Sequence, residues 1–234
     1  MLSPLSNETL STFLEGRLQI LQQKRGYRFS VDALLLSRFA KIRGNEKVID
    51  LGTGCGIIPL LLSQTTAARS FVGIEMQKGL ASIAQKNVIL NRLEKRITIY
   101  HLDFRQLKSF FSPGYFNVVL SNPPFRKYRA GRINPSMEKA IARHEVEGTI
   151  EEWIAAMAYL LPPKGRCYMI YSASRGIDLL VNLRRNSLEP KRLQWIHPRT
   201  HEEASLILVE SVKDSGTELR VMPPLMLHEA ITGC

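Results

Sequence analysis

The chain has 234 residues, 44% of them hydrophobic and 23% charged, which suits one α/β domain with a large core and argues against disorder. Three distant cysteines without metal-ligand spacing indicate neither a disulfide framework nor a zinc site, so we expect no metal, and no run approaches the roughly 18 apolar residues of a membrane span. The net charge of +11 favours a phosphate-rich partner over solubility alone. We therefore expect a cytoplasmic protein with no membrane partner; the residues carry no signal of an oligomeric state.

Residues 1–29 are expected to form an N-terminal extension that packs on the core. Leu18, Ile20 and Gln22 alternate as in a β-strand, which predicts a hairpin with its turn near Lys24-Arg25-Gly26. Residues 30–234 are then expected to form a single catalytic domain.

Short apolar segments alternate with amphipathic ones along this domain, which predicts a mostly parallel sheet covered by helices on both faces. Seven strands are predicted, at 47–51, 70–75, 97–103, 116–121, 166–172, 194–197 and 205–212. Helices are predicted at 31–42, 57–64, 78–92, 150–161 and 176–186. Only Pro198 to Ala204 separate the last two strands, which is too short for a crossover, so one strand of the sheet must be antiparallel.

The first strand of the domain is predicted to run into a glycine-rich turn. The segment reads KVIDLGTGCG, in which Asp50 precedes Gly52, Gly54 and Gly56. Glycines allow a tight turn and the close approach of a ligand. The dinucleotide fingerprint G-x-G-x-x-G is not met, because the sixth place is isoleucine. The pattern favours S-adenosylmethionine, which has no pyrophosphate to bind.

Acidic residues at the ends of the next two strands complete the predicted cofactor site. Glu75 can accept hydrogen bonds from both ribose hydroxyls, and Met76 follows it into the site. Asp103 can accept from the adenine amino group, and Phe104 can pack on the adenine ring. Each acid alone could be a turn or surface residue, but together with Asp50 they lie at three consecutive strand ends, where open α/β sheets bind ligands.

The fourth strand is predicted to end in Asn122-Pro123-Pro124-Phe125. Proline has no N–H, so this tetrapeptide could serve only to end the strand. Alternatively, the Asn122 side-chain oxygen and the Pro123 carbonyl would accept the two hydrogens of a planar NH2 group and aim its lone pair at the methyl donor. Phe125 would stack on the flat substrate. We predict methylation of a planar amine, driven by positioning, with Asn122 also touching the cofactor.

A strongly basic segment follows the tetrapeptide directly. Such a charge run is often only a solvated loop, but its place beside the catalytic turn favours contacts with the phosphates around a target base. The residues predicted to bind RNA are Arg126, Lys127, Tyr128, Arg129 and Arg132.

Three segments carry a family resemblance: Gly26–Leu36, the Asp50–Gly56 loop and the tetrapeptide beginning at Asn122. With them the chain resembles the bacterial tRNA1(Val) adenine-N6 methyltransferases over most of its length. The resemblance implies the class I methyltransferase (Rossmann-like) fold, S-adenosylmethionine as cofactor, and methylation of the adenine 3′ of the anticodon in one tRNA. It also implies that a short segment covers the cofactor's methionine end, namely Tyr27, Arg28 and Phe29.

Other functions use a similar tetrapeptide. Ribosomal RNA guanine-N2 methyltransferases often carry a duplicated domain, for which 234 residues leave no room. Release-factor glutamine N5 methyltransferases are expected to have a sizeable N-terminal helical domain, and DNA adenine methyltransferases a target-recognition domain. A catalytically silent RNA-binding module is the alternative from another class. The intact residues that argue against it are Asp50, Glu75, Asp103 and Asn122.

Overall fold

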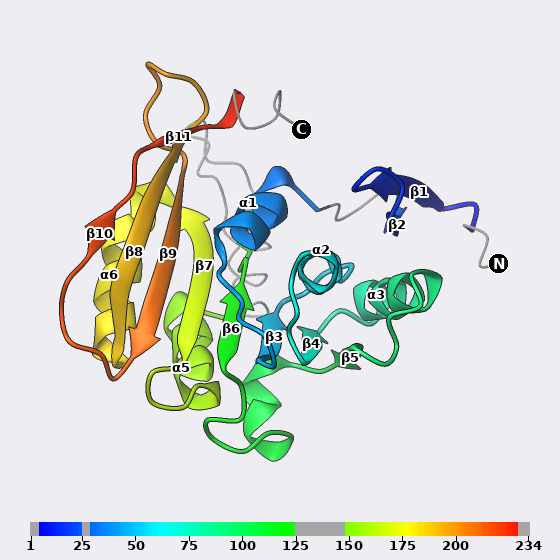
Figure 1. The fold of residues 1–234 in the computed structure, drawn as a ribbon, viewed down its shortest axis with the longest axis horizontal. Helices are drawn as coiled ribbons and strands as arrows, with labels where there is room; N and C mark the ends of the chain where they lie inside the picture. Colours follow the sequence, from blue (N-terminus) through cyan, green and yellow to red (C-terminus); the bar gives the residue numbers. More distant parts are fainter. Residues whose placement is uncertain (1–4, 25–28, 125–147, 229–234) are drawn as a thin grey trace, which may run out of the picture.

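A computed structural model describes residues 5–24, 29–124 and 148–228, and it forms three layers with a mixed sheet in the middle (Figure 1). The sheet strands are β3 (Lys47–Leu51), β4 (Ser70–Glu75), β5 (Ile97–His101), β6 (Val118–Ser121), β7 (Arg166–Ser172), β8 (Leu188–His197), β9 (Leu206–Lys213), β10 (Arg220–Val221) and β11 (Leu225–Met226). The helices are α1 (Val31–Phe39), α2 (Ile57–Thr65), α3 (Lys78–Leu90), α5 (Ile150–Leu160) and α6 (Gly176–Arg185), with short 3-10 helices η1 (Phe104–Ser109) and η2 (Ala173–Arg175).

The order of the sheet creates a crevice at its carboxyl edge. From one edge the strands run β5, β4, β3, β6, β7, β9 and β8, and β9 is antiparallel to both of its neighbours. The chain proceeds from β3 outward to β4 and β5, then returns to place β6 on the other side of β3. Leu51 and Ser121 are therefore partners at the ends of β3 and β6. Ligands of open α/β sheets bind where strand order reverses in this way.

Two apolar clusters fill the two faces of the sheet. One cluster contains buried residues of α1, α2 and α3 and of the second strand of the N-terminal hairpin (residues 18–23). The other contains buried residues of α5, α6 and η1. On α5 the apolar residues Trp153, Met157 and Leu160 recur at helical spacing and are all buried. A capping box between Thr149 and Glu152 starts this helix and fixes where Trp153 enters the core.

The architecture agrees with the expected fold: a mostly parallel sheet with helices on both faces and one strand, β9, that is antiparallel to its neighbours. The nine strands of the described sheet are the seven predicted ones and two short additions. Strands β3, β4 and β7 match their predicted bounds, and the helices end within three residues of theirs. Strand β8 begins six residues before the predicted Gln194, because tertiary pairing with β9 carries it past charged residues and a bulge at Pro190. The two-residue strands β10 and β11 extend the same edge, and they were not predicted because so short a segment has no periodicity.

The N-terminal hairpin consists of β1 (Glu8–Phe13) and β2 (Leu18–Gln23), and it lies beside α3 (Figure 1). Its turn lies between the two strands, where Leu14, Glu15 and Gly16 have positive φ. The predicted turn near Lys24 was wrong, because residues 18–23 are the second strand of the hairpin and not the first. Among the described residues, no helix has the length and apolarity needed to cross a bilayer.

Candidate active site

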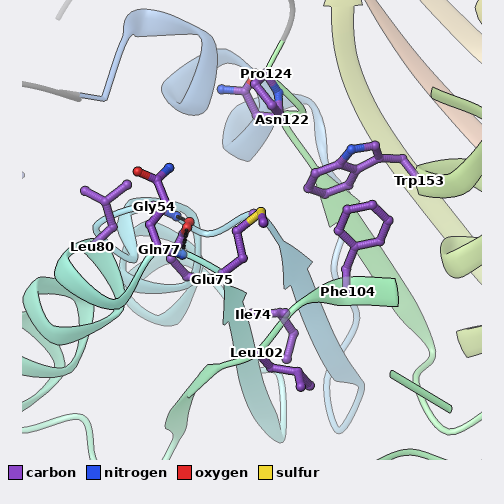
Figure 2. A pocket seen from close by; sticks show the side chains of 12 residues that line it. Gly54, Ile74, Glu75, Gln77, Leu80, Leu102, Phe104, Asn122, Pro124 and Trp153 are labelled. Carbon is purple, nitrogen blue, oxygen red and sulfur yellow. Dashed lines mark hydrogen bonds between the residues drawn. The ribbon is translucent and has the colours of Figure 1, made fainter. Parts of the chain in front are cut away.

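A pocket opens at the carboxyl edge of the sheet, beside the crevice between β3 and β6 (Figure 2). Its lining comes from four strand ends and two helices. The lining residues are Gly52, Gly54, Ile74, Glu75, Met76, Gln77, Leu80, Leu102, Phe104, Asn122, Pro124 and Trp153. Of the predicted site residues, the fold thus brings two loop glycines, Glu75, Met76, Phe104, Asn122 and Pro124 to one cavity.

The glycine-rich loop forms one wall of the pocket. Gly52 and Gly54 adopt positive φ (72° and 58°), a conformation that glycine adopts without steric cost. The backbone N–H groups of Gly52 and Thr53 both donate to the carbonyl of Ile74, at 2.9 Å, which ties the loop to β4. Gly56 does not line the pocket, and its role is to begin α2. The loop is thus held by backbone bonds that leave its pocket face free of side chains.

Glu75 connects this loop to the end of β4. One carboxylate oxygen accepts from the N–H of Gly54 at 2.9 Å, and the other from the N–H of Gln77 at 2.8 Å. Burial raises the pKa of Glu75, while these backbone hydrogen bonds oppose the shift. A carboxylate offers about four acceptor positions. Glu75 can therefore accept two further hydrogen bonds from a ligand in the pocket.

The opposite wall of the pocket is aromatic. Phe104, at the start of η1, stacks on Trp153 of α5 with ring centroids 4.2 Å apart and an interplanar angle of 27° (Figure 2). Trp153 also lies over the glycine loop, since a Cβ atom on Gly52 would come within 2.8 Å of its ring. Trp153 was not among the predicted site residues, because the spacing of apolar residues along its helix indicates burial and not which surface each one faces. Ile74, Gln77, Leu80 and Leu102 also line the pocket and were not predicted, because apolar strand and helix positions indicate only burial and a single polar residue such as Gln77 carries no motif.

The start of the predicted catalytic tetrapeptide closes the pocket from above. The Ser121 hydroxyl donates to the carbonyl of Leu51 at 3.0 Å and fixes the end of β6 to β3. Asn122 is half-buried, Pro123 is buried, and the exposed Pro124 lines the pocket with Asn122. Figure 2 shows Asn122 and Pro124 together, on the side away from Ile74 and Leu102.

Asp50 is buried at the end of β3 and does not line the pocket. Burial raises the pKa of Asp50 to about 7, and the nearby Glu75 adds to the shift. The neighbouring Thr53 hydroxyl opposes the shift without reaching ordinary hydrogen-bond geometry, so both Asp50 oxygens are left without a partner. A buried acceptor in this state favours a nearby positive charge.

Asp103 also lies outside the pocket lining. Its carboxylate caps η1 by accepting from the N–H of Arg105 at 2.9 Å, and it forms an ion pair with the same guanidinium at 2.5 Å. The hydrogen bond from the Arg105 side chain lowers the pKa of Asp103. A contact between Asp103 and adenine therefore stays a prediction.

Several predicted site residues lie outside the described part of the chain: Tyr27, Arg28, Phe125, Arg126, Lys127, Tyr128, Arg129 and Arg132. Phe29 is described and does not line the pocket. Its N–H donates to the Gln22 side chain at 3.2 Å, and its ring meets that of Phe13 edge to face at 5.3 Å. Phe29 is therefore held against the hairpin.

Comparison with known proteins decides the family. Residues 30–178 match the family described as methyltransferase small domain. The chain belongs to this family. A relative from Porphyromonas gingivalis named tRNA1(Val) (adenine(37)-N6)-methyltransferase is 30% identical over 200 residues, which cover 83% of this chain and 78% of the relative. A relative of the same name from Tolumonas auensis is 26% identical over 171 residues, covering 73% and 70%.

A solved structure of a predicted O-methyltransferase from Agrobacterium tumefaciens shares the fold, with a TM-score of 0.68, 21% identity and coverage of 84% of this chain and 88% of that one. The expected class I methyltransferase fold, the resemblance to the tRNA1(Val) enzymes and the cofactor are thereby confirmed. This small-domain methyltransferase uses S-adenosylmethionine.

Proposed function

We propose that S-adenosylmethionine binds in the pocket between Glu75 and Trp153, and that the enzyme methylates the N6 amino group of an adenine in tRNA, the adenine 3′ of the anticodon of tRNA1(Val). The observation that carries this proposal is that Asn122 and Pro124 line the same pocket as Glu75. Part of the predicted cofactor set and part of the predicted catalytic tetrapeptide thus face one space.

The chemistry of the lining suits the cofactor. Glu75 offers free acceptor positions for ribose hydroxyls, and the wall made by Ile74, Leu102 and Phe104 is apolar, as a purine ring requires. Burial raises the pKa of Asp50, and the nearby Glu75 raises it further. A cation bound near the glycine loop would offset both effects, because the Asp50 oxygens have no hydrogen-bond partner. When bound, the cofactor supplies an electrophilic methyl group and a positive charge.

The residues at the end of β6 would position the amine. The lone pair of an adenine amino group is delocalised into the ring, so the group is a weak nucleophile. If the Asn122 oxygen and the Pro123 carbonyl accept its two hydrogens, the nitrogen becomes pyramidal and its lone pair points into the pocket. The Ser121–Leu51 hydrogen bond and the buried Pro123 would hold this geometry without a mobile group. A strong general base is not required, because a methylated ammonium loses its proton readily.

The substrate is proposed from two independent supports. The relatives from Porphyromonas gingivalis and Tolumonas auensis are named for adenine 37 of tRNA1(Val). The net charge of +11 suits a polyanionic partner, because Lys and Arg contacts with phosphates release counterions.

Asn122→Ala tests the proposed chemistry. We expect kcat to fall about a thousandfold or more, as is typical when reaction geometry is lost. The Kd for S-adenosylmethionine, measured by calorimetry, should rise far less, by about tenfold at most, because Asn122 is one of many residues that line the pocket. Asn122→Asp serves as the matched variant, since it keeps one acceptor oxygen at nearly the same place. Turnover by Asn122→Ala at the wild-type rate would contradict the mechanism.

The substrate is tested by incubating the enzyme with labelled cofactor and, separately, tRNA1(Val) transcript, its variant with guanine in place of adenine 37, ribosomal RNA and a release factor. We expect N6-methyladenosine in digests of the first only. Label in ribosomal guanine or in glutamine would replace the proposed substrate with one of the two alternative classes.

The basic segment after the tetrapeptide supplies a test of RNA binding. Replacing Arg126, Lys127 and Arg129 with serine should weaken tRNA binding and lower the slope of log affinity against log salt by about one per lost phosphate contact. Replacing Lys191, Arg220 and Arg185, which lie on the β8 side of the sheet, is the charge-matched control. Equal slopes for the two triple variants would contradict a role for the segment in RNA binding.

A further inference from the structure

Two asparagines one turn apart hold the hairpin: Asn87 on the buried face of α3, and Asn91 at the residue that caps its C-terminus. The N–H of Leu21 donates to Oδ1 of Asn87 at 2.7 Å, and Nδ2 of Asn87 donates to the Leu21 carbonyl at 3.0 Å. Asn91 makes the same reciprocal pair with Gln19, at 2.9 and 2.6 Å. Each asparagine side chain thus bonds the N–H and the C=O of one β2 residue, as a neighbouring strand would, on the edge that does not pair with β1.

The spacing of the two elements makes this arrangement possible. Four residues advance a helix by about 6 Å, and two residues advance a strand by about 6.6 Å. Asn87 and Asn91 therefore stay in register with Leu21 and Gln19. Edge N–H and C=O groups that would otherwise be unpaired are satisfied by the helix.

Asn87 has one contact that Asn91 lacks. Its Nδ2 also donates to the carbonyl of Cys55 at 2.9 Å, within the glycine-rich loop. Asn87 has no exposed surface, and both hydrogens of its amide are in use. One turn earlier on α3, Ala84 packs against Gly56, where a Cβ atom would come within 3.3 Å of the Ala84 side chain. The helix is therefore fitted to the loop at two adjacent points.

This contact joins the hairpin to the pocket. Cys55 lies between Gly54 and Gly56, and the N–H of Gly54 is the group that Glu75 accepts. From the Leu21 backbone the path runs through the Asn87 amide and the Cys55 carbonyl to Gly54 and Glu75. Every step is a covalent neighbour or a hydrogen bond of 3.0 Å or less.

We propose that Asn87 is a positioning residue that holds the glycine loop in its cofactor-binding shape and couples that shape to docking of the N-terminal hairpin. The hairpin then acts as part of the cofactor site although neither of its strands lines the pocket. This inference rests on the proposed position of the cofactor beside Glu75.

The test compares Asn87→Ala with Asn91→Ala. Both remove the reciprocal bonds to β2, and both should lower the Tm, but only Asn87→Ala leaves the Cys55 carbonyl buried without a donor. We expect Asn87→Ala to raise the Kd for S-adenosylmethionine about tenfold, equivalent to about 1.4 kcal/mol, and Asn91→Ala to change it less than threefold. If Asn87→Ala and Asn91→Ala have the same Kd for S-adenosylmethionine and both have a lowered Tm, Asn87 is a purely structural residue and the proposal is overturned.

Glu75→Ala separates the inference from its premise. If Glu75→Ala weakens cofactor binding and Asn87→Ala does not, the coupling alone is wrong. If neither variant changes the Kd, the proposed cofactor position fails and the coupling fails with it.

If the variants do not fold, amide hydrogen exchange of the wild-type protein tests the same coupling. Because coupling between two sites is reciprocal, saturating S-adenosylmethionine should slow exchange of the Leu21 amide at least fivefold more than that of amides in β8, at the far edge of the sheet. Equal slowing at Leu21 and β8 would reflect global stabilisation only and would contradict the coupling.

Discussion

The two walls of the pocket differ in how they are built. The polar wall comes from residues 52–77, in which the glycine loop and Glu75 are joined by backbone hydrogen bonds. The aromatic wall joins Phe104 to Trp153, which lie far apart in the chain and meet by packing alone. Directional bonds therefore fix the first wall locally, whereas the second wall depends on how α5 docks on the sheet.

The largest expected effect on cofactor binding comes from the polar wall. Glu75→Ala removes the acceptor for Gly54 N–H and Gln77 N–H as well as the proposed ribose acceptor. We expect the Kd for S-adenosylmethionine to rise about a hundredfold, because two ligand bonds to a charged group and the loop geometry are lost together. Isothermal calorimetry measures the change, and a rise of less than threefold would remove Glu75 from the site.

The aromatic wall should show a mixed effect on stability and binding. Trp153→Ala is expected to cost about 3–5 kcal/mol of folding free energy, as for large buried aromatics, and to raise the cofactor Kd about tenfold. Trp153→Phe keeps a ring against Phe104, so it should retain most of the folding free energy and most of the cofactor affinity. Loss of stability with an unchanged Kd would show that the polar wall alone binds the cofactor.

Asp50 predicts a distinctive dependence of stability on pH. Its folded-state pKa, about 7, lies above its unfolded value of about 3.9, so the folded state retains the proton to higher pH. The contribution of Asp50 to the free energy of unfolding is fully present below about pH 4. It is lost as the pH rises through 7, and the loss is of the order of 4 kcal/mol. Without ligand, the Tm of Asp50→Asn should therefore fall less between pH 4 and pH 7 than the Tm of the wild type. Parallel Tm curves for the two proteins would contradict an uncompensated buried carboxyl.

The smallest expected effect is at Asp103, where the ion pair with Arg105 competes with any ligand. Asp103→Asn should raise the cofactor Kd about threefold, the loss of one partly exposed hydrogen bond. Arg105→Ala is the matched control, because it removes the ion pair and keeps the carboxylate. If both variants weaken binding equally, the carboxylate acts only through Arg105 and not through adenine.

The sequence by itself was sufficient for the layered sheet, for the glycine-rich turn after β3, and for the placement of Glu75 and Asn122 at strand ends beside one pocket, while their roles stay predictions. These features depend on local signals: apolar segments of strand length, glycines directly after a strand, and polar residues at consecutive strand ends, which parallel pairing brings to one edge. The antiparallel pairing of β8 with β9 followed equally from the short connection between them.

Only the tertiary structure decided the rest. Trp153 joined the pocket because α5 packs against η1, and nothing in the spacing of α5 specifies that partner. The hairpin turn, the early start of β8 and the pairing of Asp103 with Arg105 likewise depend on neighbours that compete for the same groups. Periodicity records which side of an element is apolar, but the contact that this side makes is chosen by shape and hydrogen bonding across distant parts of the chain.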